Sequence, residues 1–479
     1  MLWSSVGKFG TLGLTFISNL VLARLLMPSD YGCIGMLHVF IAISSIFVSA
    51  GFGSALVQKK NPTHIDYTSV FYWNLSASII FYWILFFCGP AIARFYSMPE
   101  LCPVLRVQSL SLIIQAFSTV QSCQLQKQIR FKELSMRNLL ASFVGTVVAI
   151  TLAFFGFGVW SLVWNNIVAS TCGVILLWKM SDWRPTWEFS WQSLKELFSF
   201  GGLMALSSFM ETLYGNILSL ILGKWYSSSD LGYYTQARKL EQVPTEAMGS
   251  IVSSVSFPVF STLQDDIEKL RYGVRKNIKS IMYLNIPLMF LLCVIADPLI
   301  HFLYGAKWES SILYFQLLCL GGALYTLNSV NVNVIKALGR SNIFFFTQLT
   351  KRAISLLLII AVAVIGKKGI IDGVLGLVAV LSASFYLNAV INAIVNKRLI
   401  GYGIADQFKD IFHYFLISGV VATITIFVGK LLTIHPYLVM LVQCCAFVFL
   451  YWLSSVLFNL EGYKVYLEVL STKLIRRRK

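Results

Sequence analysis

Charged residues are scarce in this sequence, and so are the patterns that mark enzymes. Only 12% of the 479 residues are charged, whereas 57% are hydrophobic. A soluble domain carries roughly twice that charge density. HExxH, GxSxG and P-loop patterns are absent. The nine cysteines form no CxxC pair and most lie within apolar runs, which disfavours a zinc site or a disulfide framework. We therefore expect neither an enzyme nor a bound cofactor.

Apolar runs of about 20 residues, each long enough to cross a hydrocarbon core, recur along the whole chain. Lipid offers no partner to backbone groups, so the spanning segments must be helical. We expect an all-α integral membrane protein with about fourteen transmembrane helices. They are predicted near residues 3–26, 33–57, 67–95, 103–125, 135–155, 158–178, 198–222, 238–262, 279–303, 311–335, 343–366, 371–396, 408–432 and 437–459.

The net charge of +17 reflects membrane topology rather than nucleic-acid binding, because the basic residues lie in short connections between the helices. If the N-terminus is inside, 25 of the 38 basic residues fall on the inner side and 10 on the outer side. Cytoplasmic connections are enriched in Lys and Arg. We therefore expect both termini in the cytoplasm, with the basic tail 476–479 touching anionic lipid.

The chain also resembles itself at a spacing of 200 to 215 residues. The sequence SDYG at 29–32 recurs as SDLG at 229–232, and FKELSMR at 131–137 recurs as FTQLTKR at 346–352. GVWSLV at 158–163 then recurs as GVLGLV at 373–378. The order is conserved and the offset grows slowly, which indicates an internal repeat. A repeat of six helices, an even number, predicts parallel lobes related by an axis along the membrane normal.

This repeat predicts two six-helix lobes around a central cavity, an arrangement suited to alternating access. Two extra helices then follow at the C-terminus. The expected domains are an N-terminal lobe over 1–180, an amphipathic cytoplasmic connector over 181–197, a C-terminal lobe over 198–398, and the extra helices with the basic tail over 399–479.

Polar residues form one stripe on the first helix and another on the seventh. The stripes consist of Thr11, Thr15 and Asn19, and of Ser208, Gly215 and Ser219, which occupy equivalent registers 200 residues later. They are predicted to line the cavity, although small polar residues also serve helix packing. Lys8 and Glu211 share these faces, and an ionisable group deep in a bilayer costs at least about 2.5 kcal/mol. Lys8 is a candidate for cargo binding or an interface anchor, and Glu211 for coupling to H⁺ or Na⁺.

Basic residues also pair across the repeat. Arg24 and Lys224 lie at the outer ends of the first and seventh helices. Arg137 corresponds to Arg352, with Lys351 beside it, at the inner ends of the fifth and eleventh helices. Interface anchoring and the positive-inside bias are the alternative explanations. The functional explanation is a site for a phosphate-bearing cargo, which arginine grips through two parallel hydrogen bonds.

Three segments resemble a known family. They are LARLLMPSDYG at 22–32, GFGSALVQ at 51–58 and GFGVWSLV at 156–163. They look like the Wzx-type polysaccharide exporters of the multidrug/oligosaccharidyl-lipid/polysaccharide (MOP) flippase superfamily, closest to its colanic-acid-exporter-like branch. The resemblance implies fourteen helices, the last two bordering a groove for a lipid tail.

The resemblance further implies a flippase in the bacterial cytoplasmic membrane. Such a protein moves an undecaprenyl-pyrophosphate-linked oligosaccharide from the inner to the outer leaflet, for the biosynthesis of lipopolysaccharide or exopolysaccharide. The implied partners are this cargo, membrane lipids and the polysaccharide polymerase machinery.

Two other functions compete with this one. A membrane glycosyltransferase or polymerase needs acidic or histidine groups on a substantial outer loop. The longest expected outer connection, near 223–237, carries only Asp230, which is better explained as a helix cap. A cation or drug antiporter of the same superfamily needs acids within the membrane. Only a few are available: Glu211, Glu241, Glu246 and Asp297. The basic pairs therefore favour an anionic cargo.

Overall fold

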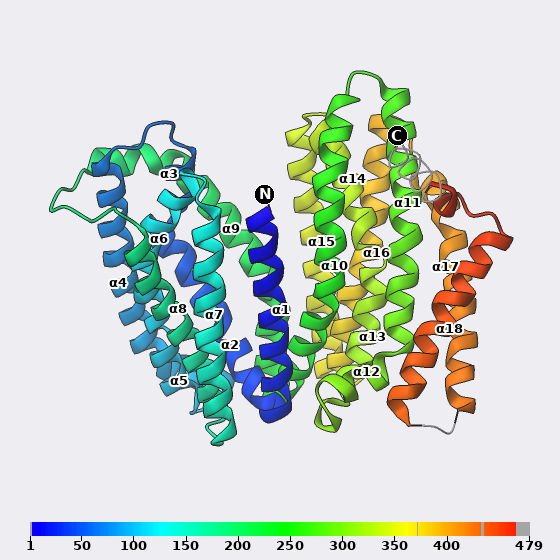
Figure 1. The fold of residues 1–479 in the computed structure, drawn as a ribbon, viewed down its shortest axis with the longest axis horizontal. Helices are drawn as coiled ribbons and strands as arrows, with labels where there is room; N and C mark the ends of the chain where they lie inside the picture. The colour runs from blue at the N-terminus through cyan, green and yellow to red at the C-terminus, as the bar shows by residue number, and fades with distance from the viewer. Residues whose placement is uncertain (1, 371, 433–434, 466–479) are drawn as a thin grey trace. The chain divides into compact units, whose positions relative to one another are not determined.

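The computed structural model describes residues 2–370, 372–432 and 435–465, with side chains from residue 10 onward. All regular secondary structure in these ranges is helical, which confirms the expected all-α fold. Contacts divide the chain into two compact units, Met1–Gly232 and Tyr233–Lys479. Within each unit the helices run alongside one another (Figure 1). The sequence-based lobe boundaries, with the second lobe starting at residue 198, stay a prediction.

The first unit is built on pairs of neighbouring helices. α1 packs on α7, α7 on α8, and α6 on both α4 and α8, while α9 lies against α2, α3 and α4. The elements are α1 (Leu2–Leu25), α2 (Pro28–Ser49), α3 (Phe52–Gln58), α4 (His64–Tyr96), α5 (Leu101–Gln108), α6 (Leu110–Lys127), α7 (Phe131–Phe154), α8 (Val159–Met180), α9 (Trp191–Trp225) and the first residues of α10 (Ser228–Thr262).

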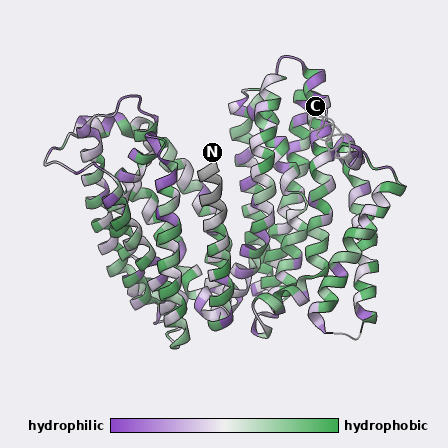
Figure 2. Cartoon of the chain, viewed as in Figure 1, coloured by the Kyte–Doolittle hydropathy of each residue, from purple (hydrophilic) through white to green (hydrophobic). Residues whose placement is uncertain are grey.

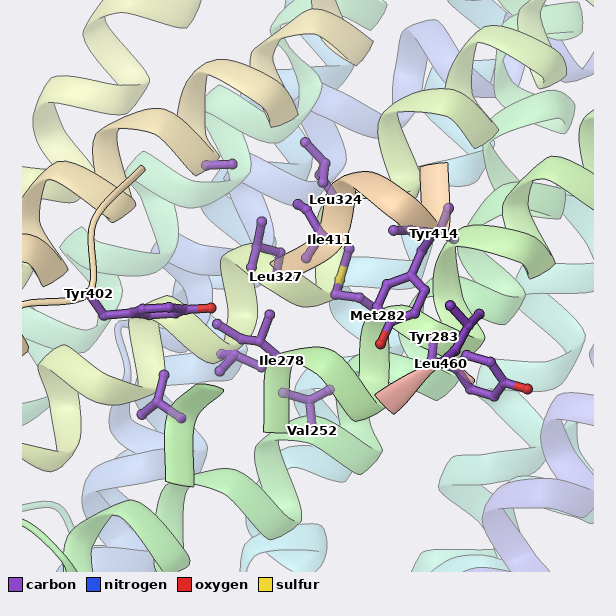
Figure 3. Close-up of a cluster of buried hydrophobic side chains, with 14 of the residues drawn as sticks. Val252, Ile278, Met282, Tyr283, Leu324, Leu327, Tyr402, Ile411, Tyr414 and Leu460 are labelled. Carbon is purple, nitrogen blue, oxygen red and sulfur yellow. The ribbon is translucent and has the colours of Figure 1, made fainter. Parts of the chain in front are cut away.

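The second unit packs around α11, which contacts α13, α14, α16, α17 and α18. Beyond α10, its elements are α11 (Ile267–Val294), α12 (Ala296–Leu303), a 3₁₀ turn (Ala306–Trp308), α13 (Ser311–Gly322), α14 (Tyr325–Ala337), α15 (Ser341–Lys367), α16 (Gly373–Ile400), α17 (Ile404–Leu431) and α18 (Pro436–Leu457). Their shared core includes Ile278, Leu327 and Ile411 (Figure 3). The two C-terminal helices are thus part of this core rather than an appendage.

Among the described residues, twelve spans are long and apolar enough to cross a membrane. Hydrophobic residues recur along the helices of both units, interleaved with more polar ones (Figure 2). The expected count of fourteen is not confirmed. The first expected helix contributes only the shorter apolar stretch Gly10–Leu25. The eighth, α10, contains two prolines and several charged residues, so it falls outside the twelve.

Several expected helices are interrupted. The segment 33–57 breaks where Ala50 and Gly51 take positive φ angles of 44° and 72°. The segment 311–335 breaks at residues 323–324, between α13 and α14. The long outer connection expected near 223–237 is wrong: only residues 226–227 separate α9 from α10, because the polar residues after them form the first turn of a helix. The helix α9 starts at Trp191, so residues 191–197 of the expected connector are continuous with it.

Candidate functional site

The repeated SDYG and SDLG motifs perform the same structural task. Asp30 accepts a hydrogen bond from the backbone N–H of Met27, at 2.9 Å, in the first turn of α2. Asp230 accepts one from the backbone N–H of Ser227 at 3.1 Å, and the Ser227 hydroxyl accepts one from the Asp230 N–H at 3.0 Å. Both aspartates therefore satisfy free donors at a helix N-terminus. The predicted capping role of Asp230 is confirmed.

The glycines of the two motifs bring the starts of α2 and α10 together. A Cβ atom added to Gly32 would lie 1.8 Å from the carbonyl oxygen of Ser228, and one added to Gly232 would lie 1.9 Å from that of Pro28. Residues 28 and 32 correspond to 228 and 232 under the repeat. The contact is therefore reciprocal, as across a two-fold axis. All four residues belong to the first unit. Only glycine permits so close a backbone approach.

The other family-like segments are also tight glycine turns in the first unit. Gly158, with φ of 53°, starts α8 beside α2, and its added Cβ would lie 3.2 Å from a carboxylate oxygen of Asp30. Gly51 starts α3 against α9, and its added Cβ would lie 2.0 Å from the carbonyl oxygen of Gly201. The glycines of the motifs that carry the resemblance therefore encode close packing.

The outer cations Arg24 and Lys224 lie in the last turns of α1 and α9, as the repeat predicts. Both side chains are exposed. Lys224 donates a hydrogen bond to the carbonyl of Phe95, and its ammonium lies 4.5 Å from the centre of the Phe95 ring. Lys224 therefore also stabilises the C-terminal end of α4, where backbone carbonyls have no partner within the helix.

The inner cation Arg137 is wedged between α7 and α8. Its side chain is half-buried, and its Nε donates to the carbonyl of Gly173 at 3.3 Å. A Cβ at position 173 would lie only 2.7 Å from the guanidinium, so the glycine makes room for the arginine. One guanidinium nitrogen also donates to Asn138 at 2.9 Å. Neither of these hydrogen-bond partners carries a negative charge.

In the second repeat, Lys351 occupies a comparable place between α15 and α16. Its side chain is only 6% exposed, and its Nζ donates to Oδ1 of Asn392 at 3.1 Å. The neighbouring Arg352 is half-buried. The sequence placed Lys351 in an open basic vestibule, whereas in this conformation its ammonium is enclosed by protein.

Amide side chains form hydrogen bonds between the helices near this lysine. Asn392 donates to Asn328 at 2.9 Å, and Asn331 exchanges hydrogen bonds with Gln407 at 3.0 and 3.1 Å. Asn396 donates to Asn331 at 2.8 Å. These bonds join α14, α16 and α17. In this conformation Asn331 and Asn392 therefore link helices.

The two polar stripes are partly exposed. The side chains of Thr15, Ser208, Glu211 and Gly215 are exposed, and those of Thr11, Asn19 and Ser219 are half-buried. The side chain of Lys8 lies outside the described residues, as does the basic tail 476–479. Exposure suits either water or lipid contact, so the expected role of the stripes stays a prediction.

Sequence reasoning missed an ion cluster at the start of α17. Asp410, only 3% exposed, accepts two hydrogen bonds from Arg275, at 2.6 and 2.7 Å, and lies 3.2 Å from the Lys279 ammonium. Lys279 also pairs with Glu461. Burial and the negative charge of Asp410 raise the pKa of Tyr402, which donates a hydrogen bond to that carboxylate at 2.9 Å. The cluster fastens α17 and the residues that follow α18 to α11.

A smaller ion cluster closes one end of the first unit. Lys59 pairs with the buried Asp66 at 2.8 Å and with Glu196 of α9 at 3.5 Å. The hydrogen bond that Lys59 donates to Asp66 raises the pKa of Lys59. This three-residue arrangement links the connection before α4 to α9. Nothing in the local sequence signals it, because Glu196 lies far from the other two residues along the chain.

The comparison with known proteins decides the family. A family model described as "Polysaccharide biosynthesis protein" matches residues 21–313, which is more than half of the chain. The chain belongs to this polysaccharide biosynthesis protein family. The resemblance inferred from these motifs is thereby confirmed, and all three segments that carry it lie within the matched residues.

Curated relatives extend this family assignment over most of the chain. The succinoglycan biosynthesis transport protein ExoT of Rhizobium meliloti is 28% identical over 404 residues, covering 84% of this chain and 78% of that protein. The lipopolysaccharide biosynthesis protein WzxC of Escherichia coli is 25% identical, covering 82% and 78%.

Solved structures show the same fold. The lipid II flippase MurJ in an inward closed conformation matches with a TM-score of 0.73 at 16% identity, over 96% of this chain and 99% of that one. A multidrug resistance MATE family transporter of the MOP superfamily, in an inward-facing conformation, matches with a TM-score of 0.62 at 17% identity, over 81% and 94%. This chain thus combines multiple candidate membrane spans with the fold of these transporters.

Proposed function

We propose that this protein is a flippase that moves a lipid-linked anionic oligosaccharide across the cytoplasmic membrane, from the inner to the outer leaflet, for surface polysaccharide biosynthesis. The family match over residues 21–313 carries the proposal. The printed names of the relatives place them in succinoglycan and lipopolysaccharide biosynthesis. The sequence resemblance supplies the cargo, an oligosaccharide on undecaprenyl pyrophosphate.

The distribution of charge supports an anionic cargo over a cationic one. The helices α13, α14, α15 and α16 contain no Asp or Glu, whereas α15 carries Lys351 and Arg352 near its inner end. A diphosphate carries at least two negative charges, and its electrostatic attraction to each nearby cation is stronger in a low-dielectric cavity than in water. Organic cations would require acids at this depth instead.

Within this proposal, the basic residues paired by the repeat handle the pyrophosphate. Arg24 and Lys224 would form an outer site, and Arg137 and Arg352 an inner one. Lys8 would bind cargo with them, and Thr11, Thr15, Asn19, Ser208, Gly215 and Ser219 would line the cavity. Glu211, exposed on α9, is the acid proposed to bind a coupling H⁺ or Na⁺. Lys351 is enclosed in this conformation, so its direct contact with cargo requires another state.

The lipid tail would stay in the bilayer while the head group crosses between the lobes. Exposed apolar side chains recur every three or four residues along α17: Phe408, Phe412, Leu416, Val420, Ile424 and Phe427. This spacing forms a continuous apolar stripe along one helix face. We propose that the stripe faces lipid acyl chains. The orientation with both termini in the cytoplasm belongs to the same proposal.

Charge-swap variants test the proposed cationic site in a strain whose glycan export depends on this chain. Arg24→Glu and Arg352→Glu should each abolish export at normal protein levels, because they place a negative charge where the diphosphate binds. Arg24→Lys and Arg352→Lys should be partly tolerated. Lys60→Glu, in an exposed connection, is the control and should export normally. Normal export by both Arg24→Ala and Arg352→Ala would show that these residues are only interface anchors.

A further inference from the structure

Lys351 is a buried cation that forms no ion pair with the residues that the structure describes. It lies about 15 Å along α15 from Ser341, at 1.5 Å per residue. Its ammonium donates to the neutral amide of Asn392. The helices packed against α15 are α14 and α16, and neither contains an acid. The charged groups on these three helices are all basic: Lys336, Lys351, Arg352, Lys367, Lys397 and Arg398.

Such an environment disfavours a permanent positive charge. An ionised amine that is removed from water needs a paired charge or several strong acceptors, and here one amide oxygen is its hydrogen-bond partner among the described residues. A lysine can relieve the cost by releasing its proton, whereas an arginine cannot. The site therefore favours a lysine that is charged in one conformation and neutral in another.

The first repeat offers a built-in comparison. Its cation between the equivalent helices α7 and α8 is Arg137, which is half-buried and donates to a backbone carbonyl. Arg137 stays charged at any physiological pH. Of the two cations held between the fifth and sixth helices of the repeats, Lys351 is the one whose charge can change.

The hydrogen bonds around Lys351 lead to a break in a membrane-spanning segment. Lys351 donates to Asn392, Asn392 donates to Asn328, and Asn328 donates to the carbonyls of Leu324 and Phe385, at 3.1 and 2.9 Å. Leu324 lies between the end of α13 and the start of α14. In each of these hydrogen bonds, the donor is the group nearer to Lys351 along the chain of bonds. A neutral amine has a lone pair that can accept a hydrogen bond, so loss of the proton would favour the opposite orientation of the Asn392 amide.

We propose that Lys351 is a proton-binding coupling residue that acts together with Glu211 in the transport cycle, an inference that rests on the proposed flippase function. In the conformation described here the ammonium is protonated and orders the amide chain up to the break at residues 323–324. Because enclosure without a paired charge disfavours the charged form, the ammonium gives up one proton from this enclosed site and becomes a neutral amine. When the site opens to water on the other side of the membrane, the amine binds a proton again, and this resets the chain.

The deciding variant is Lys351→Arg, which keeps the positive charge but cannot release a proton. Lys351→Met removes the charge at similar side-chain length. Lys368→Arg is the matched control, because Lys368 is exposed just beyond the opposite end of α15. Each purified protein would be reconstituted in liposomes with a fluorescent undecaprenyl-pyrophosphate-linked sugar. Translocation would be measured with and without a pH gradient, and with a sodium gradient at equal pH.

The proposal expects the pH gradient to accelerate translocation by the unmodified chain and by Lys368→Arg. It expects the ratio of rates with and without the gradient to fall to about one in both Lys351 variants. A pH response in Lys351→Arg equal to that of the unmodified chain would overturn the proposal. It would also be overturned if the sodium gradient accelerated translocation by the unmodified chain and the pH gradient did not. Failure of the unmodified chain to bind or move the lipid-linked sugar would instead count against the proposed flippase function.

A second measurement does not require cargo. The side-chain amines of the ¹⁵N-lysine-labelled protein would be titrated by NMR in detergent, and the Lys351 signal assigned as the one missing from both variants. The proposal expects this amine to lose its proton at a lower pH than the exposed lysines. A Lys351 amine that stays protonated as long as the exposed lysines do would overturn it.

Discussion

The crossing of α2 and α10 should tolerate no side chain at Gly32. An alanine Cβ there would lie 1.8 Å from the Ser228 carbonyl oxygen and 2.6 Å from its carbon. The obstacle is backbone, which cannot rotate away as a flexible side chain would. Ordinary contact begins near 3.4 Å, so the two helix starts would have to separate by about 1.5 Å. Overpacking of this kind costs about 1–3 kcal/mol.

The expected result for Gly32→Ala is a lower melting temperature of the purified protein and weakened glycan export. Each kcal/mol lowers the melting temperature by about 2–4 °C in a domain of 150–250 residues. Gly232→Ala should behave in the same way, because its Cβ would lie 1.9 Å from the Pro28 carbonyl oxygen. The double variant should cost less than the sum of the two, since one separation of the helices relieves both clashes.

Gly13→Ala is the control for this prediction. A Cβ at Gly13 would meet nothing within 4 Å, so alanine should be neutral or should stabilise α1 by up to about 1 kcal/mol through its higher helix propensity. If the melting temperature and the glycan export of Gly32→Ala equal those of Gly13→Ala, the reciprocal contact between α2 and α10 does not exist in the folded protein. Strict additivity of Gly32→Ala and Gly232→Ala would show that the two glycines do not share one contact.

Three further predictions concern other parts of the chain. Asp410→Asn should lower the free energy of unfolding by about 2–3 kcal/mol, because it leaves Arg275 and Lys279 without their shared carboxylate. The control Asp265→Asn, at an exposed position, should change the free energy of unfolding little. Equal melting curves for the two variants would refute the role of the ion cluster. Cysteines placed at Thr11, Thr15, Glu211 and Gly215 in a Cys-free background should react with a water-soluble thiol reagent, and protection of all four under every condition would favour simple helix packing. Reporter fusions after residues 62, 183 and 340 should report cytoplasm and those after 30, 98 and 368 the outside, so consistent reversal would exclude the proposed orientation.

The features that the sequence predicted well depend on local patterns. Apolar length is enough to identify most spanning helices. The capping role of Asp230 follows from its place at a helix start, where its partner Ser227 is three residues away. The span α10 shows the limit of hydropathy. Its two prolines and its charged residues lower its mean hydropathy, so hydropathy alone does not identify it as a span. Its residues from Tyr233 onward nevertheless pack within the second unit.

The features that the sequence missed depend on residues brought together by the fold. Asp410 and Arg275 lie 135 residues apart, and no pattern near either one announces the pair. The enclosure of Lys351 likewise involves Asn392 on another helix. Its charge and its approximate depth could be predicted from the sequence, but its enclosure could not. The reciprocal approach of Gly32 and Gly232 was encoded in a repeat that the sequence did reveal, but only coordinates show that the two copies touch.

The most direct test of the proposed function is translocation by the purified chain alone. The protein would be reconstituted in liposomes with an undecaprenyl-pyrophosphate-linked oligosaccharide whose fluorophore is quenched by a membrane-impermeant reagent. The account predicts that the fluorophore exchanges between leaflets in liposomes with the unmodified chain and remains in its leaflet in liposomes with Arg24→Glu or Arg352→Glu. Exchange no faster than in protein-free liposomes, with the protein folded and inserted, would contradict the assignment as a flippase.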